Sequence, residues 1–179
     1  FNQGFSAIGV SDDGAWLVSS SNFAKTVKVV CGTGPDVVNI GNADFRGAVS
    51  VSGGDGDDRI SVSGGPDFHK VLKISAGAGT NTVTVGACGL FAGAVVSGGG
   101  DGDAITLRQF TTLGAFTLKC GGGADTLSIE SIDVRNNILL DGGPGSDTVT
   151  GLTSFQVSKP YRKQAKGFGR NARIEGNLR

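Results

Sequence analysis

Gly142-Gly143-Pro144-Gly145-Ser146-Asp147-Thr148-Val149-Thr150 is the stretch that decides the fold of this chain. The same arrangement recurs at Gly53-Gly54-Asp55-Gly56-Asp57-Asp58-Arg59-Ile60-Ser61. Each is a glycine-rich turn, then an aspartate, then a run in which polar and apolar residues alternate. Looser copies begin at Cys31, Ala76, Gly98 and Cys120. The six copies therefore start at regular intervals of about 22 residues, and a fixed period of this size indicates a repeat architecture.

We call these copies repeats 1 to 6 and number positions from the first residue of each. Position 6 carries an acid or amide in every repeat: Asp36, Asp58, Asn81, Asp103, Asp125 and Asp147. Positions 8 and 10 are apolar around a polar position 9, except that Gly151 stands at position 10 of repeat 6. This period of two predicts a strand with one buried face. Positions 19 and 21 predict a second, closing strand by the same pattern, with one residue inserted near Pro66 in repeat 2.

A unit of this length cannot bury its own apolar face, whereas stacked units can. Two strands per repeat, all running in the same direction, predict a parallel β-helix, that is, a β-solenoid. We expect one all-β domain over residues 9–158, a right-handed parallel β-helix with about seven coils of about 22 residues, counting a degenerate first repeat from Gly9. Residues 1–8 are expected to cover the first coil. A two-layer β-sandwich also has short strands but does not require this register.

Composition places the chain among secreted proteins in our interpretation. Its 32 glycines are periodic and tied to alternating apolar residues, which favours order over disorder. There is no methionine, so Phe1 is not a translation start. Removal of a signal peptide or excision from a longer protein would explain this, and we expect secretion. No run is long and apolar enough to predict a membrane span.

Charge divides the chain into two parts. Residues 1–158 carry nine Lys and Arg against fifteen Asp and Glu, a net charge of −6, whereas residues 159–179 carry seven against one, a net charge of +6. The basic tail predicts an acidic partner: the body of this or a neighbouring copy, an anionic polysaccharide or a cell surface, and not nucleic acid. The candidate assembly residues are Lys159, Tyr161, Arg162, Lys163, Lys166, Phe168, Arg170 and Arg173.

The three cysteines are predicted to form no disulfide within the chain. Cys31 and Cys120 share position 1 four coils apart, about 19 Å in a stack. A disulfide needs α-carbons within about 7 Å. Cys88 lies on another side of the coil. The odd count leaves an intermolecular bridge open.

The glycine and aspartate turns resemble the nonapeptide of hemolysin-type secreted proteins, with the pattern G-G-x-G-x-D-x-U-x, where U is large and apolar. Residues 53–61 and 142–150 match every specified position, and residues 120–128 miss only the first glycine. The resemblance implies secretion and calcium bound by aspartates and turn carbonyls between coils. Hemolysin-type turns recur every nine residues, whereas these recur once in about 22, which is more like a β-helix than a calcium β-roll.

Two interpretations of the aspartates remain open. A stacked row of carboxylates is costly without a cation, and oxygen ligands suit Ca²⁺. The candidate calcium ligands are Asp36, Asp58, Asp103, Asp125, Asp147, Asp55, Asp57 and Asp101. In the alternative, each aspartate accepts N–H bonds from its own turn. Asn81 interrupts the row, which favours this alternative.

We therefore expect a non-enzymatic, extracellular structural or surface protein that self-assembles as a filament or surface layer. Its coil ends and its basic tail, docked on an acidic neighbour, would make the contacts. A calcium-stabilised binding or adhesion module is the alternative. A polysaccharide-active enzyme is third, because pairs such as Asp101 and Asp103 or Asp55 and Asp57 resemble an acid and a base but belong to the repeated turn.

Overall fold

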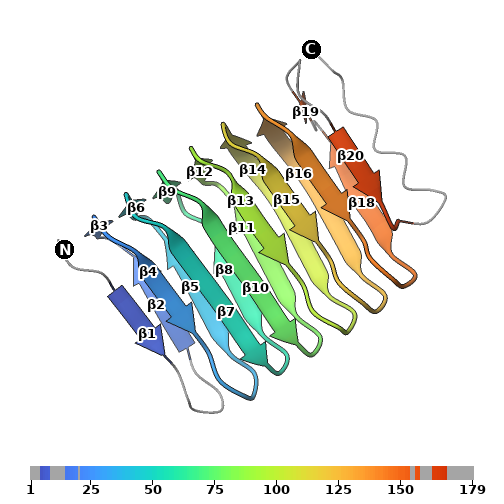
Figure 1. Ribbon diagram of the computed structural model, residues 1–179, viewed down its shortest axis with the longest axis horizontal. Helices are drawn as coiled ribbons and strands as arrows, with labels where there is room; N and C mark the ends of the chain where they lie inside the picture. The colour runs from blue at the N-terminus through green and yellow to red at the C-terminus, as the bar shows by residue number, and fades with distance from the viewer. Residues whose placement is uncertain (1–4, 9–14, 20, 154–155, 158–162, 169–179) are drawn as a thin grey trace.

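The computed structural model describes residues 5–8, 15–19, 21–153, 156–157 and 163–168, which form an all-β parallel solenoid (Figure 1). The predicted fold class is confirmed, with about six coils of about 22 residues rather than about seven. Residues 9–14, where the degenerate first repeat would begin, lie outside the described part of the chain. No helix of the described residues is long and apolar enough to cross a membrane.

The closing strands of successive repeats pair side by side in one sheet, which we call the closing sheet. In spatial order its strands are β1 (Phe5–Ile8), β4 (Val27–Val30), β7 (Val49–Asp55), β10 (Leu72–Ala78), β13 (Ala94–Ser97), β15 (Phe116–Lys119), β17 (Ile138–Asp141) and β20 (Lys163–Lys166). Every pairing in it is parallel.

The first strands of the repeats form the second, opening sheet, and a row of short strands continues it beyond a bend. The first strands are β2 (Ala15–Ser19), β5 (Val37–Gly41), β8 (Arg59–Val62), β11 (Thr82–Gly86), β14 (Ala104–Thr112), β16 (Thr126–Val134) and β18 (Thr148–Thr153). The short strands are β3 (Asn22–Phe23), β6 (Asp44–Phe45), β9 (Asp67–Phe68), β12 (Gly89–Leu90) and β19 (Gln156–Val157). In repeats 4 and 5 one long strand, β14 or β16, runs through the bend.

The pairing register confirms the period read from the sequence. Equivalent positions of successive repeats pair through most of both sheets, as in Val83 with Ile105. Ile40 pairs with Val62 at the regular period, but Phe45 pairs with Phe68, which an extra residue has displaced along the chain. That residue therefore lies between these two pairs, in the segment that contains Pro66, as predicted.

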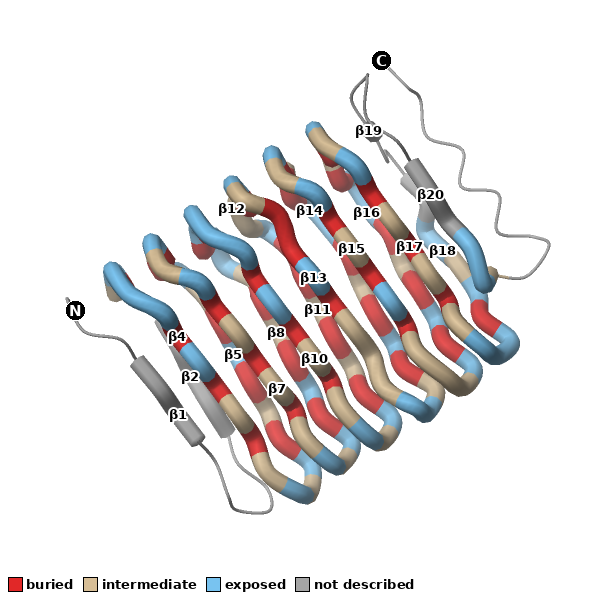
Figure 2. Tube along the Cα trace, viewed as in Figure 1, coloured by how far each residue is buried: buried red, intermediate tan, exposed pale blue. Residues whose placement is uncertain are grey.

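The core consists of the alternating positions that the sequence pattern selected, and Figure 2 shows them as repeated buried segments along the coils. Position 15 fills the corner beside the short strands, where Phe23, Phe45, Leu90 and Val134 are all buried. The rings of Phe23, Phe45 and Phe68 form a continuous stack, with centroid distances of 5.1 and 4.9 Å. Such stacking turns separate repeats into one core.

The turn before each aspartate requires glycine at position 2. A methyl group on Gly77 would collide with the carbonyl oxygen of Gly54, and one on Gly121 would collide with that of Gly99. Gly77 and Gly121 also have φ angles of 105° and 113°, which side chains rarely tolerate. Successive turns can therefore stack this closely only when position 2 carries no side chain.

A left-handed residue at position 12 makes the bend between the opening sheet and the short strands. Asn42, Ala87, Gln109 and Ser131 have φ angles between 45° and 52°. In repeat 2, Gly64 and Gly65 take the left-handed conformation instead. Left-handed backbone is uncommon outside glycine, so its recurrence at one position shows that the bend is a fixed part of the coil.

The last coil departs from the period. The repeat would pair Ile138 with Pro160, but Ile138 pairs with Lys163 in β20, further along the chain. Proline cannot donate to a sheet ladder, which is a physical reason for the shift. Strand β20 thus lies within residues 159–179, the predicted basic tail.

Candidate functional site

The position 6 side chains form one buried row, which we call the aspartate row. None of its members is more than 3% exposed: Asp36, Asp58, Asn81, Asp103, Asp125 and Asp147. The preceding glycine turn brings the chain around so that position 6 faces inward while position 7 faces solvent. Six turns stacked in register therefore place five carboxylates and one amide in a line.

A hydrogen bond to the backbone links each member of this row, from Asp58 onward, to the repeat before it. The Oδ1 atom of Asp58 accepts the backbone N–H of Asp36 at 2.8 Å, and that of Asp103 accepts the N–H of Asn81 at 2.8 Å. The same bond recurs between Asp58 and Asn81 (2.9 Å), Asp103 and Asp125 (2.7 Å), and Asp125 and Asp147 (3.0 Å). The row is thus a ladder between coils.

The second carboxylate oxygen is less well satisfied. In Asp103 the Oδ2 atom accepts the N–H of Gly99, in its own turn, at 2.6 Å. In Asp58, Asp125 and Asp147 the Oδ2 atom is buried without a hydrogen-bond partner. An unpaired carboxylate oxygen is costly to bury, so these three side chains carry a desolvation penalty.

In repeat 3, the amide of Asn81 leaves no unpaired oxygen of this kind, because its nitrogen donates hydrogen bonds where the aspartates have the Oδ2 atom. Its Nδ2 atom donates to the carbonyl oxygens of Gly79 at 2.9 Å and Gly77 at 3.3 Å, both in its own turn. The space beside the position 6 side chain is therefore lined by acceptors in repeat 3. A neutral donor fits there, and Asn81 also separates the carboxylates of repeats 1 and 2 from those of repeats 4 to 6.

Burial raises the pKa of Asp58, Asp103 and Asp125 above the usual aspartate value. Backbone hydrogen bonds oppose this shift in all three, while like charges add to it: Asp36, Asp57 and Asp55 around Asp58, and Asp147 and Asp103 around Asp125. These three side chains therefore favour the protonated form more than exposed aspartates do.

The flanking carboxylates hold the turn of repeat 3 from both sides. Asp57 accepts the backbone N–H of Thr80 at 2.8 Å, and Asp101 accepts that of Gly79 at 3.1 Å. Asp55, in the glycine-rich turn of repeat 2, is exposed. These contacts give Asp57 and Asp101 a place in the stacking of the turns, which the sequence did not reveal.

The aspartates do not converge as a calcium site would require. Among the described residues, no three or more His, Cys, Asp or Glu side chains form a group that could hold a metal ion. In the row, the Oδ1 atoms of Asp58 to Asp147 already accept backbone N–H groups, whereas Ca²⁺ takes six to eight oxygen ligands. This donor set fits the ion poorly, and calcium binding stays a prediction from the resemblance.

The described part of the basic tail contacts the body of its own chain. The Nζ atom of Lys166 is 2.8 Å from Oδ2 of Asp141. Phe168 packs against the core, and its backbone forms an isolated parallel β-bridge with that of Asp147. Lys163 begins β20. The other candidate assembly residues, Lys159, Tyr161, Arg162, Arg170 and Arg173, lie outside the described residues.

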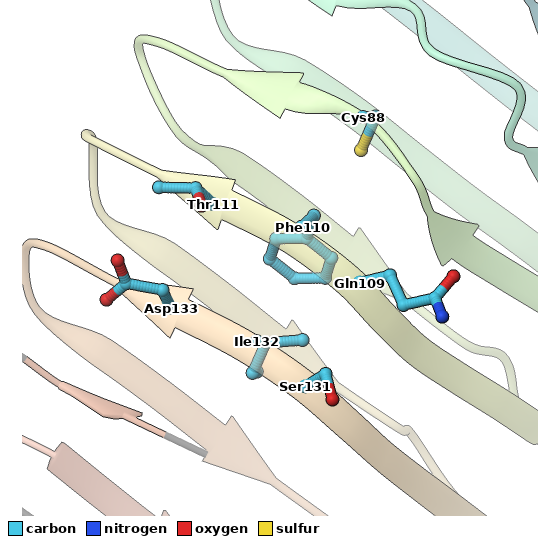
Figure 3. Close-up of a pocket in the computed structure, with 7 residues that line it drawn as sticks. All are labelled: Cys88, Gln109, Phe110, Thr111, Ser131, Ile132 and Asp133. Atoms are coloured by element: carbon cyan, nitrogen blue, oxygen red, sulfur yellow. The ribbon is translucent and has the colours of Figure 1, made fainter. Parts of the chain in front are cut away.

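A hollow of about 410 Å³ lies along the bend in repeats 3 to 5 (Figure 3). Cys88, Phe110 and Ile132 line its apolar part, and Gln109, Thr111, Ser131 and Asp133 supply polar groups. Burial raises the pKa of the Cys88 thiol to about 12, so the thiol stays protonated and is a poor nucleophile. Cys88 therefore does not give this hollow an activated thiol.

The prediction of no disulfide is confirmed, since Cys31, Cys88 and Cys120 are all free thiols.

Comparison of the chain with known protein families, with curated proteins and with solved structures finds no match.

Exchanging acid and amide in the row should change stability in opposite directions. Asp125→Asn should raise the free energy of unfolding at pH 7 by on the order of 1 kcal/mol, because an amide can donate where the Asp125 Oδ2 atom is unpaired. Asn81→Asp should lower it by a similar amount, because the row becomes uninterrupted. Urea unfolding measures both, with exposed Asp67→Asn as a control that should change it by less than about 0.5 kcal/mol. A loss of stability in Asp125→Asn would contradict this account.

The raised pKa values also predict a pH dependence. An aspartate whose folded pKa lies above its unfolded pKa contributes stability below the unfolded value, near 3.8, and loses it as pH rises through the folded value. The difference in unfolding free energy between wild type and Asp125→Asn should therefore grow in favour of the variant as pH rises from about 3.8. A difference that does not change with pH between acid and neutral conditions would show that Asp125 does not titrate abnormally.

Proposed function

We propose that this protein is a non-enzymatic, extracellular structural or surface protein whose solenoids stack end to end. The observation that carries the proposal is that both sheets finish in strands with a single partner. Among the described strands, β1 pairs only with β4 and β2 only with β5. At the other end, β20 pairs only with β17, and β18 only with β16.

A strand with one partner has backbone N–H and C=O groups along its outer edge, and such edges are templates for pairing with another chain. Here the edges of both sheets face along the solenoid axis, because the coils are stacked along it (Figure 1). A second copy placed on the end of the first can therefore continue both sheets at once.

The direction of the strands determines the kind of assembly. All described pairings are parallel, so the last coil of one copy would meet the first coil of the next in the same orientation. That contact joins two different surfaces, and a heterologous contact that does not close into a ring gives an open filament. The predicted product is a filament one solenoid wide.

The basic segment supports this assembly from within the chain. Strand β20 and the Lys166–Asp141 ion pair extend the closing sheet by one strand beyond β17. Strand β20 would thus supply the edge of the closing sheet that receives the next copy. The extracellular location is part of the proposal and rests on the resemblance of the turns to those of secreted proteins.

Electron microscopy of the full chain should show filaments of single-solenoid width, and a chain ending at Ser158 should form shorter or no filaments because it lacks β20. Two proline variants sharpen the test. Successive N–H groups of a strand point to opposite edges, so of Ser6→Pro and Ala7→Pro in β1, one removes an N–H that faces β4 and the other an N–H at the open edge. The open-edge variant should lose filaments while keeping the melting temperature of wild type.

Single particles of the full chain at all concentrations would contradict the proposal. So would filaments that persist unchanged in both proline variants, because end pairing through β1 would then be unnecessary.

A further inference from the structure

Two hollows lie along the bend, one after the other. One is the hollow of repeats 3 to 5 described above. The other has a volume of about 530 Å³ and takes its polar lining from the three coils before it: Ser21, Asn22, Asn42, Asp44 and Asp67. Apart from Gly65, beside the insertion in repeat 2, every described lining residue of both hollows stands at position 12, 13 or 14 of its coil.

The two hollows follow each other without an intervening coil. Asp67, at position 14 of repeat 2, pairs with Gly89 of repeat 3, which is next to Cys88 in the chain. A methyl group on Gly89 would collide with the Asp67 carboxylate, so this carboxylate reaches over the backbone of repeat 3. We call the two hollows together the bend groove. It crosses six coils, which places its ends about 24 Å apart.

The groove has a floor and two polar banks. The floor is position 13, whose residues are buried or half-buried: Ser21, Ala43, Pro66, Cys88, Phe110 and Ile132. Figure 3 shows Gln109 and Ser131, at position 12, on one side of the floor residues, and Thr111 and Asp133, at position 14, on the other. Hydrogen-bonding side chains therefore flank a low, mostly apolar strip that runs along the solenoid axis.

The backbone along the groove is already hydrogen-bonded between coils. The N–H of Gly89 donates to the carbonyl oxygen of Pro66 at 3.0 Å, and the N–H of Gly65 donates to that of Ala87 at 2.8 Å. A peptide that adds a strand to a sheet needs unpaired backbone groups along an edge. A ligand in this groove must instead be bound by side chains.

The charges of the groove disfavour an anionic ligand. Three of its lining residues are acidic, Asp44, Asp67 and Asp133, and no Lys or Arg is among its described lining residues. Two of the acids already have a cation, because the Nε atoms of Arg46 and Arg135 lie 3.1 and 2.9 Å from Asp44 and Asp133. The groove would therefore repel a polyanion, and it has little free negative charge to hold a polycation.

The other polar lining groups are amides and hydroxyls, which both donate and accept hydrogen bonds. Sugar hydroxyls do the same, and the C–H groups of a sugar ring can lie on an apolar floor. The coils repeat every 4.8 Å or so, close to the length of one pyranose unit, whereas an extended peptide advances about 3.3 Å per residue. Successive sugars of an extended glycan can therefore meet equivalent positions of successive coils.

We propose that the bend groove binds a neutral linear polysaccharide, with the chain along the solenoid axis and about one sugar per coil. This site lies on the side of the solenoid, whereas the proposed end-to-end contact uses the strand edges at its ends. Binding of the polysaccharide therefore does not depend on filament formation, and the two proposals can fail separately.

Isothermal titration calorimetry of the full chain tests the ligand class with oligosaccharides of defined length. The neutral probes are cellohexaose, xylohexaose and mannohexaose, and the charged probes are the hexamers of galacturonic acid and of glucosamine. At least one neutral hexamer should bind more tightly than both charged hexamers. It should also bind at least about tenfold more tightly than its own disaccharide, because contacts in successive coils add to the binding free energy.

Variants test whether the groove is the binding site. Gln109→Ala and Ser131→Ala should each weaken binding of that hexamer about fivefold, the effect of losing one hydrogen bond. Alanine suits this backbone, since Ala87 has the same left-handed conformation at position 12. Thr111→Trp should weaken binding at least about tenfold, because the indole would fill the groove in repeat 4.

Thr117→Trp is the matched control for the blocking variant. Thr117 is half-buried like Thr111, but it lies in β15 of the closing sheet, away from the groove. This control should bind the hexamer like wild type, and both tryptophan variants should keep a melting temperature close to that of wild type.

Four results would each overturn the proposal. One is that no neutral hexamer binds at the highest concentration reached, and another is a charged hexamer that binds more tightly than every neutral one. A hexamer that binds no more tightly than its disaccharide would show a single local site in place of a groove. Unchanged binding to a folded Thr111→Trp variant would place the ligand elsewhere. Absence of filaments with normal binding would instead count against end stacking alone.

Discussion

The hydrogen bond from the backbone N–H of one position 6 residue to the side chain of the next holds the coils of this protein in register. It requires a short side chain with an acceptor at that position, which Asp and Asn both supply. It also requires the backbones of successive turns to approach with no side chain between them, which explains glycine at position 2. Strand alternation, the buried phenylalanine stack and the inward core positions all follow once successive coils are aligned in this way.

The ladder has an electrostatic cost, and the sequence limits it in two ways. Asn81 interrupts the line of carboxylates with a neutral side chain that also donates to its own turn. Asp57 and Asp101 accept N–H groups of that same turn from opposite sides. The third repeat is therefore an uncharged link between two acidic blocks. A repeated aspartate that resembles a metal ligand in sequence acts here as a backbone acceptor, and this use explains its position without an ion.

Most of the fold followed from periodicity, because a parallel stack makes the same demands of every coil. The inserted residue near Pro66 and the buried positions 8 and 10 were predictable for that reason. The bend was not, since Asn42, Ala87, Gln109 and Ser131 share a left-handed backbone but no common chemistry. The direction of the aspartate bonds was only partly foreseen: the bond within a single turn occurs at Asp103, while the bonds between coils depend on contacts distant in sequence. The shift of β20 past Pro160 was hidden because the period ends there.

Hydrogen exchange of individual amides, followed by NMR, tests the ladder most directly. Residues in glycine-rich turns ordinarily exchange fast, because their N–H groups face water. If the ladder holds the coils together, the amides of Asp36, Asp58, Asn81, Asp103 and Asp125 should exchange as slowly as those of the core strands. Exchange at these five amides as fast as at neighbouring turn residues would show that the bonds do not persist, and would contradict the account.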